Sequence, residues 1–429
     1  MVDSLASDVQ LIKDYNLTGV AEISKKYDAL RNFTHTSIAA YLDDLAELKA
    51  LVKAALPYTA NKTLISNPDF SSTIGWNVKS GTYTSGDQTT TTQAGKKCWN
   101  AWWSISASGN EAQTMAVNQS LKQLSGGLYA LECKATTQHL CETDQHGFLT
   151  VGETTVNSQP LPYGLLDLPT FSNSEKWVTL TTPYIYVEPN GTATIGFQGS
   201  KQGAVDKQWM PYASPTSAGD NREGWWCATD FTLRYVPMQL STADAAGWGT
   251  VCTPYVITAP EGVTLYSIVG LSPDSLYIGI EEVTGETVAG TPYIYKAQPS
   301  QQVLFAESGT AVTAAKTNVN GLRGTFSTAA KYPLNALALT DGKWKVVTER
   351  YPIISYSAYI YKVAQLPVLP DGWTGITLMT EGLAKGTSVG QVQADDAATT
   401  VRYYNLAGQT VSPSAKGIIV TEKGKGIRK

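Results

Sequence analysis

Histidines and cysteines are the first residues to consider for chemistry, and their supply in this chain is small. The three histidines are His35, His139 and His146. A nucleophilic hydrolase needs a base beside its serine or cysteine. Only His139 and His146 stand near a cysteine, Cys141, and no glycine-flanked nucleophile turn accompanies them. We therefore expect no nucleophilic hydrolase.

Carboxylates could instead act in pairs, as in glycoside hydrolysis, where two acids lie about 5 to 10 Å apart across the scissile bond. The acids in the tryptophan-rich middle of the chain are Asp144, Asp206, Asp220, Glu223 and Asp230. Acids are common in loops, and nothing in this spacing holds two of them across a cleft. The sequence therefore predicts no catalytic residues.

Tryptophan is the strongest local signal. Eight of the eleven tryptophans fall between residues 63 and 237. A tryptophan face can stack on a sugar ring while nearby polar groups orient its hydroxyls. We expect a shallow site for a neutral or acidic glycan around the loop 220–226. The predicted ligand-binding residues are Trp102, Trp103, Asp144, His146, Trp209, Asn221, Arg222, Trp225 and Trp226.

The competing interpretation is that these tryptophans are core residues, since each ring buries roughly 150 to 250 Å². Neighbours on a strand face opposite ways. In a pair such as Trp225 and Trp226, one ring is therefore expected in the core and the other at the surface.

Cysteine usage does not suggest a disulfide framework. There are five cysteines, an odd number, and none has the CxxC or Cys/His spacing of a zinc site. We expect free buried thiols, with a Cys133–Cys141 bridge as the alternative.

Charge and hydropathy exclude two further classes. The net charge is −4, charged residues make up 16% of the chain, and no basic run occurs before the last few residues, so nucleic acid is not expected as a partner. No apolar stretch reaches the roughly 18 residues of a membrane helix. The start at Met1 lacks the basic and apolar regions of a signal peptide.

The spacing of apolar residues predicts helices in the N-terminal residues 1–58. Ile38, Tyr41, Leu45, Leu48, Val52 and Ala55 are spaced three and four apart, behind Thr36 or Ser37 as a cap. One apolar stripe per helix implies a bundle of two or three helices. It serves as a spacer or, alternatively, binds a protein partner.

The rest of the chain alternates with period two, as in Ala193, Ile195 and Phe197. At about 100 to 200 residues per domain, 429 residues form several domains. The expected fold is multidomain and mainly β. Its parts are a helical bundle at 1–58, an antiparallel β-sandwich (jelly roll) at 63–237, a second β module at 245–365 and a small C-terminal β segment at 373–429.

Two segments carry a family resemblance. Residues 64–70, LISNPDF, followed by Gly75-Trp76, resemble the opening strand of galactose-binding-like jelly rolls, and 229–235, TDFTLRY, resemble the closing strand. That family includes many carbohydrate-binding modules. The resemblance implies glycan binding and a structural calcium ion near these strands, with Asp69 and Asp230 as oxygen ligands.

The C-terminus carries a second resemblance. Residues 404–411, YNLAGQTV, and 416–420, KGIIV, are similar to the terminal segment of many Bacteroidetes secreted and surface proteins, which in some relatives is a sorting signal. A hairpin that only caps the preceding module is the alternative. The resemblance implies an extracellular or outer cell-surface location, with the signal peptide removed or truncated from this chain.

These observations predict a non-catalytic protein that binds a glycan or surface polysaccharide, or acts in adhesion, at the cell surface. Two alternatives stay open: a structural scaffold without a small ligand, and an accessory region of a larger glycan-degrading enzyme.

Overall fold

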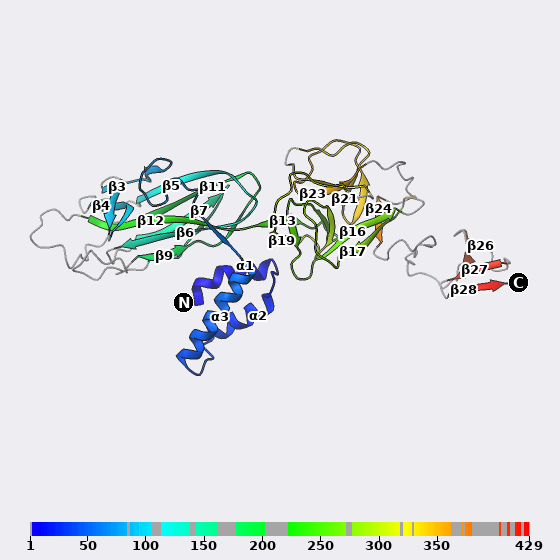
Figure 1. Cartoon of the computed structure of the whole chain (residues 1–429), viewed down its shortest axis with the longest axis horizontal. Coiled ribbons are helices and arrows are strands. Elements are labelled where there is room, and N and C mark those ends of the chain that lie inside the picture. The colour runs from blue at the N-terminus through cyan, green and yellow to red at the C-terminus, as the bar shows by residue number, and fades with distance from the viewer. Residues whose placement is uncertain are drawn as a thin grey trace, which may run out of the picture.

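The computed structural model describes most of the chain. The described residues are 2–83, 86–93, 95–104, 113–137, 143–161, 177–201, 222–271, 277–317, 321–327, 330–361, 371, 374–379, 403–404, 410–411, 417–421 and 424–428. The protein is mainly β, with helices only near its N-terminus in this part of the chain (Figure 1).

The N-terminal segment forms a short 3-10 turn, η1 (Val2–Leu5), and three helices: α1 (Ala6–Asp14), α2 (Val20–Arg31) and α3 (Ile38–Ala55). The Ser37 hydroxyl accepts a hydrogen bond from the Ala40 amide at 3.1 Å, which confirms the predicted cap. Leu45 and Leu48 are buried, but Ile38 is 74% exposed. The predicted stripe was therefore wrong at Ile38.

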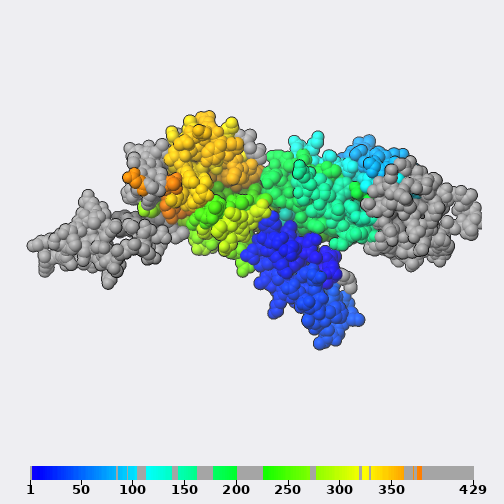
Figure 2. Space-filling model, turned by 180° about the vertical axis from the view of Figure 1, so that it is seen from behind, coloured from blue at the N-terminus to red at the C-terminus, as the bar shows by residue number. Residues whose placement is uncertain are grey.

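The helices pack on β-sheet rather than standing apart as a spacer. Their core includes Leu128 and Val236 of the adjacent sheet and Leu304 of the next β unit. The Asn16 side chain also donates to the Glu261 carbonyl. Figure 2 shows the helices as a blue projection beneath the boundary of the two β units. None of the described helices has the length and apolar character needed to cross a membrane.

Two antiparallel sheets form a β-sandwich, as expected. One contains seven strands, in the order β10-β6-β12-β4-β3 with β9 beside β6 and β1 beside β12. They are β1 (Thr59–Asn61), β3 (Gly86–Gln93), β4 (Lys96–Ser104), β6 (Gly127–Thr137), β9 (Val178–Thr181), β10 (Ile185–Val187) and β12 (Arg222–Val236). The other has the order β2-β5-β11-β7-β8. It contains β2 (Asn77–Ser80), β5 (Gln113–Leu124), β7 (Thr143–Val151), β8 (Thr154–Asn157) and β11 (Gly191–Lys201).

Aromatic residues fill the space between the sheets. Phe70 and Phe231 have ring centroids 5.9 Å apart, and Trp76 lies 4.9 Å from Phe231. The Phe231 amide donates to the Pro68 carbonyl at 3.0 Å. The opening segment therefore lies against β12, the strand expected to close the sandwich.

The second β unit follows directly after Pro237. A three-stranded sheet is formed by β13 (Met238–Thr242), β15 (Val256–Thr258) and β19 (Gln302–Ser308). A nine-stranded sheet is formed by β14 (Trp248–Val251), β16 (Thr264–Leu271), β17 (Tyr277–Glu282), β18 (Tyr293–Lys296), β20 (Leu322–Thr325), β21 (Leu337–Thr340), β22 (Lys343–Val346), β23 (Ser357–Ile360) and β24 (Ile376–Met379).

The C-terminal strands form a small antiparallel sheet. They are β25 (Tyr403–Tyr404), β26 (Thr410–Val411), β27 (Gly417–Thr421) and β28 (Gly424–Arg428). Tyr404 pairs with Thr410, so β25 and β26 lie side by side in this sheet.

A tyrosine-lined cleft between the two β units

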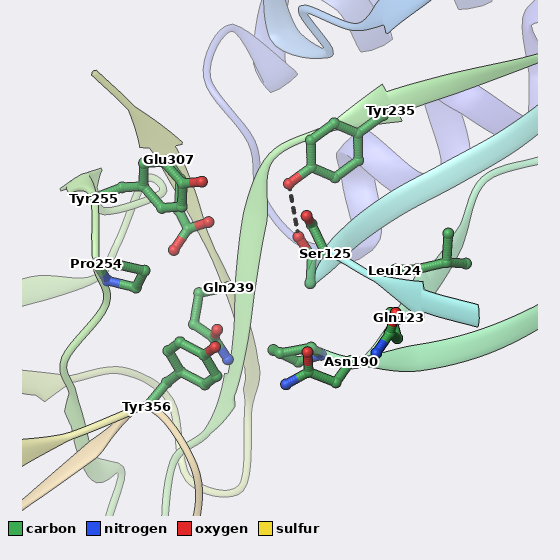
Figure 3. Close-up of a pocket in the computed structure, with 12 residues that line it drawn as sticks. Gln123, Leu124, Ser125, Asn190, Tyr235, Gln239, Pro254, Tyr255, Glu307 and Tyr356 are labelled. Carbon is green, nitrogen blue, oxygen red and sulfur yellow. Dashed lines mark hydrogen bonds between the residues drawn. The ribbon is translucent and has the colours of Figure 1, made fainter. Parts of the chain in front are cut away.

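A cleft of ≈ 170 Å³ lies where the sandwich meets the second β unit. That volume corresponds to about five or six water molecules at ~30 Å³ each. Figure 3 shows residues of the two units facing one another across it. The lining residues are Gln123, Leu124, Ser125, Gly126, Pro189, Asn190 and Tyr235 from the sandwich, and Gln239, Pro254, Tyr255, Glu307 and Tyr356 from the second unit.

The sandwich side is built on the turn between β5 and β6. The Tyr235 hydroxyl donates to the Gly126 carbonyl at 2.9 Å, and the Tyr129 hydroxyl donates to the Ser125 carbonyl at 3.1 Å. Gly127 has φ 149°, and a Cβ there would lie 2.6 Å from the Tyr235 ring. Glycine at 127 is therefore what lets Tyr235 pack against the turn.

The opposite side comes from the second unit. Tyr255 immediately precedes β15, and β15 pairs with β19 so that Ile257 lies opposite Glu307. Along β19, the buried Val303 and Phe305 alternate inward, and Glu307 continues the same row at the strand end. This alternation places a carboxyl group at the end of an apolar layer.

Three lining residues have a left-handed backbone. Gln123, Asn190 and Tyr356 have φ values of 56°, 60° and 55°. Asparagine tolerates this region, but it is uncommon for glutamine and tyrosine. Such conformations persist where the surrounding structure holds them, and they cluster at ligand clamps. The Tyr356 carbonyl accepts a hydrogen bond from the Cys252 amide at 2.8 Å, which helps to hold its backbone.

Burial controls the ionisation of the cleft. Burial raises the pKa of Glu307 to about 7, and a hydrogen bond with the Thr253 side chain opposes that rise. Burial, followed by the Glu307 charge, raises the pKa of Tyr356. The Tyr356 hydroxyl is therefore protonated at neutral pH and can donate a hydrogen bond.

Several polar groups in the cleft are available to a ligand. Within the described part of the chain, the hydroxyls of Tyr255 and Tyr356 have no hydrogen-bond partner. The Gln239 side chain is buried and uses its amide nitrogen on the Leu240 carbonyl at 2.7 Å. The cleft therefore combines aromatic faces with unused hydroxyl groups and one carboxyl.

The predicted tryptophan site lies elsewhere, in and around the sandwich. Trp103 and Trp226 are 0% exposed, on the inner faces of β4 and β12. Trp102 is partly buried and lies on the opposite face of β4, beside Cys98 and Cys227. Trp102 and Trp103 thus face opposite ways as expected. The prediction that Trp103 and Trp226 contact a ligand was wrong, because the two-residue period turns both rings into the core.

The structure describes only some of the other predicted site residues. His146 is buried, and its Nδ1 lies 3.0 Å from Asp144 Oδ1, so these two do lie together. Trp209 and Asn221 fall outside the described residues. For Arg222 and Trp225 the structure describes the strand backbone of β12 but not the side chains. A glycan site at this end of the sandwich stays a prediction.

The proposed calcium ligands have other partners. Asp230 Oδ2 accepts a hydrogen bond from Lys96 Nζ at 2.9 Å and lies 3.6 Å from Lys134 Nζ. Burial raises the pKa of Asp230, but the charges of these two lysines lower it by more. The pKa of Asp230 therefore lies below its ordinary value. Asp69 accepts from the Ser71 amide at 3.0 Å.

Calcium would need several oxygen ligands around it. Two ammonium groups already neutralise Asp230, so its surroundings do not fit calcium. Among the described residues, no three His, Cys, Asp or Glu side chains gather where they could hold a metal ion.

Cysteine chemistry adds no site in the described region. Cys98, Cys133, Cys227 and Cys252 are free and buried, as expected. The alternative bridge from Cys133 to Cys141 is therefore wrong, and Cys141 itself lies outside the described residues. Burial raises the pKa of the Cys133 thiol, which makes it a poor nucleophile.

Sequence reasoning missed the cleft because it concentrated on tryptophan. The chain has 23 tyrosines against 11 tryptophans. One indication for Glu307 was present in the sequence, because this residue continues the every-second-residue pattern of the apolar Val303 and Phe305. Nothing in the sequence brings residues near 125, 190, 255 and 356 together.

Comparison with family models and with curated proteins finds no match. Among solved structures, the carbohydrate-binding module TmCBM61 in complex with beta-1,4-galactotriose is 14% identical, covering 40% of this chain and 98% of that one, with a TM-score of 0.25. The family 11 module of the Clostridium thermocellum cellulase Lic26A-Cel5E is 10% identical, covering 39% and 91%, with a TM-score of 0.21.

A third similar structure is a module of Cellvibrio mixtus lichenase 5A in complex with cellotriose. It is 13% identical, covering 37% of this chain and 96% of that one, with a TM-score of 0.20. Likenesses this weak carry no argument about the ligand of this chain.

Proposed function

We propose that this chain is a non-catalytic sugar-binding protein whose ligand lies in the cleft between the two β units. The observation that supports it is the convergence of Tyr235, Tyr255 and Tyr356 on one small space with unused polar groups. Aromatic faces provide apolar contact area for a sugar ring, and a few hydroxyl and carboxyl groups fix its orientation.

The size of the cleft suits one sugar residue rather than a long chain. The ≈ 170 Å³ space leaves room for a single ring. With few contacts, immobilising the ligand consumes most of the gain. We therefore expect dissociation constants from micromolar to millimolar, about −4 to −8 kcal/mol.

The proposal includes a location at the outer cell surface, where such a protein meets glycans or surface polysaccharide. It rests on the resemblance of the C-terminal residues described above. A purely structural scaffold and an accessory region of a glycan-degrading enzyme remain the competing functions.

A glycan array followed by calorimetry tests the proposal. The wild-type protein should bind at least one sugar, and Tyr255→Ala and Tyr356→Ala should each weaken binding about tenfold or more. Tyr351→Ala is the matched control, because Tyr351 is 43% exposed and does not line the cleft. Its binding should be unchanged.

Three other outcomes are informative. If Trp225→Ala abolishes binding and the tyrosine variants do not, the site is the predicted one at the end of the sandwich. If no sugar on the array binds, the scaffold function is favoured. If the full-length gene encodes a catalytic domain beyond this chain, the accessory function is favoured.

A further inference from the structure

The cleft contains a carboxyl group without a cation. None of its twelve lining residues is Lys, Arg or His. Among the described residues, only the neutral Thr253 side chain hydrogen bonds to the Glu307 carboxyl, and no lysine or arginine charge lowers the pKa of Glu307. Glu132, a partly buried acid, pairs with Arg234 at 2.6 Å. Glu307, like Glu188, has a pKa raised by burial and no described counter-charge.

Aromatic rings accompany this carboxyl. Figure 3 shows the Tyr255 ring beside Glu307, and Tyr356 on the same side of the cleft near Gln239. The negative face of an aromatic ring attracts a cation, and ligands with ammonium groups are recognised by such rings together with an acid. A second carboxylate, Glu188, also acts on Tyr356. The lining is thus suited to a positive group and unsuited to a negative one.

We propose that the cleft selects a sugar that carries a protonated amino group, with Glu307 accepting its hydrogen bonds and Tyr255 and Tyr356 contacting its charge. This inference rests on the proposed function, because it names the class of sugar for the same cleft. It also predicts that acidic sugars are rejected, since their carboxylate would meet Glu307 without a cation between them.

The energetics agree with this assignment. Burial raises the pKa of Glu307 to about 7, so the free protein holds the group near the point of ionisation. An ammonium group that enters the cleft supplies the missing charge and favours the carboxylate. A hydrogen bond between charged partners is stronger than one between neutral groups, which gives the amino sugar its advantage.

Calorimetry at pH 7 with four sugars tests the inference on the full chain. D-glucosamine should bind about tenfold more tightly than D-glucose, the factor expected for one charge-assisted hydrogen bond. N-acetyl-D-glucosamine, whose amine is neutral, should bind like glucose. D-glucuronate should bind more weakly than glucose, and this comparison needs no variant.

Glu307→Gln should remove the preference for glucosamine and bring glucosamine and glucose to equal affinity. Glu281→Gln is the control, because it makes the same change of charge at an exposed residue of the same unit. Melting curves of both variants establish that they are folded. Equal affinity of the wild type for glucosamine and glucose would overturn the inference and leave the proposed function standing. If none of the four sugars nor any array glycan binds, the proposed function itself fails.

Discussion

Replacing Glu307 by Gln should change how the stability of the protein depends on pH. The carboxyl has an ordinary pKa of 4.5 and a folded-state pKa of about 7, because burial disfavours its charge. Between these two values the folded protein binds more protons than the unfolded chain. Wild-type stability should therefore fall as the pH rises from about 4.5 to 7, and stay reduced above pH 7.

The magnitude follows from the two pKa values. At about 1.4 kcal/mol per pH unit, a pKa that moves from 4.5 to about 7 sets an upper limit of about 3.5 kcal/mol. Part of the side chain is in contact with water, so we expect about 1 to 2 kcal/mol. Glutamine keeps the shape and hydrogen bonding of the group but does not titrate. Glu307→Gln should thus exceed the wild type in stability by that amount at pH 8, and this excess should become smaller at pH 5 and vanish below the ordinary pKa of 4.5.

Urea denaturation at pH 5, 6, 7 and 8, followed by tryptophan fluorescence, measures this difference. Burial also raises the pKa of Asp8 to about 6, but Asp8 is present in both proteins and cancels in the comparison. The exposed-site control, Glu281→Gln, should show the same pH dependence as the wild type. A stability difference between Glu307→Gln and wild type that is the same at pH 5 and pH 8 would refute the argument.

Three further predictions concern the helices, the sandwich core and the metal. Leu45→Ala should cost about 2 to 5 kcal/mol, whereas Leu42→Ala, at a residue 45% exposed, should cost far less; melting followed by circular dichroism compares them. Trp226→Ala should lower the stability of the sandwich by about 3 to 5 kcal/mol, and an unchanged urea midpoint would show that the ring is not core. Excess calcium should leave the melting temperature unchanged, because Lys96 and Lys134 already neutralise Asp230; a rise that chelator reverses would restore the predicted calcium site.

Local patterns in the sequence determined the secondary structure well. The three-and-four spacing predicted α3, including its cap at Ser37 and its buried Leu45 and Leu48. The two-residue period predicted that Trp102 and Trp103 face opposite sides of a strand. These properties depend on near neighbours in the chain, because helix and strand geometry fix which side chains share a face.

The tertiary structure decided which faces are covered and what they meet. Ile38 belongs to the apolar stripe of α3 but is exposed, whereas Leu45 and Leu48 of the same stripe are buried. Asp230 and Lys96 are 134 positions apart in the chain. Because they pair in the folded protein, the Asp230 carboxylate is no longer the free calcium ligand that the sequence predicted.

The cleft is the clearest case of this division. Its lining residues range from Gln123 to Tyr356, and the strand pairings that bring them together leave no spacing that could be read in advance. The sequence by itself determined that Glu307 follows an inward-facing row. Only the packing of the two β units decided that this row ends at a space lined by tyrosines and without a cation, since burial and charge pairing depend on residues that are distant along the chain.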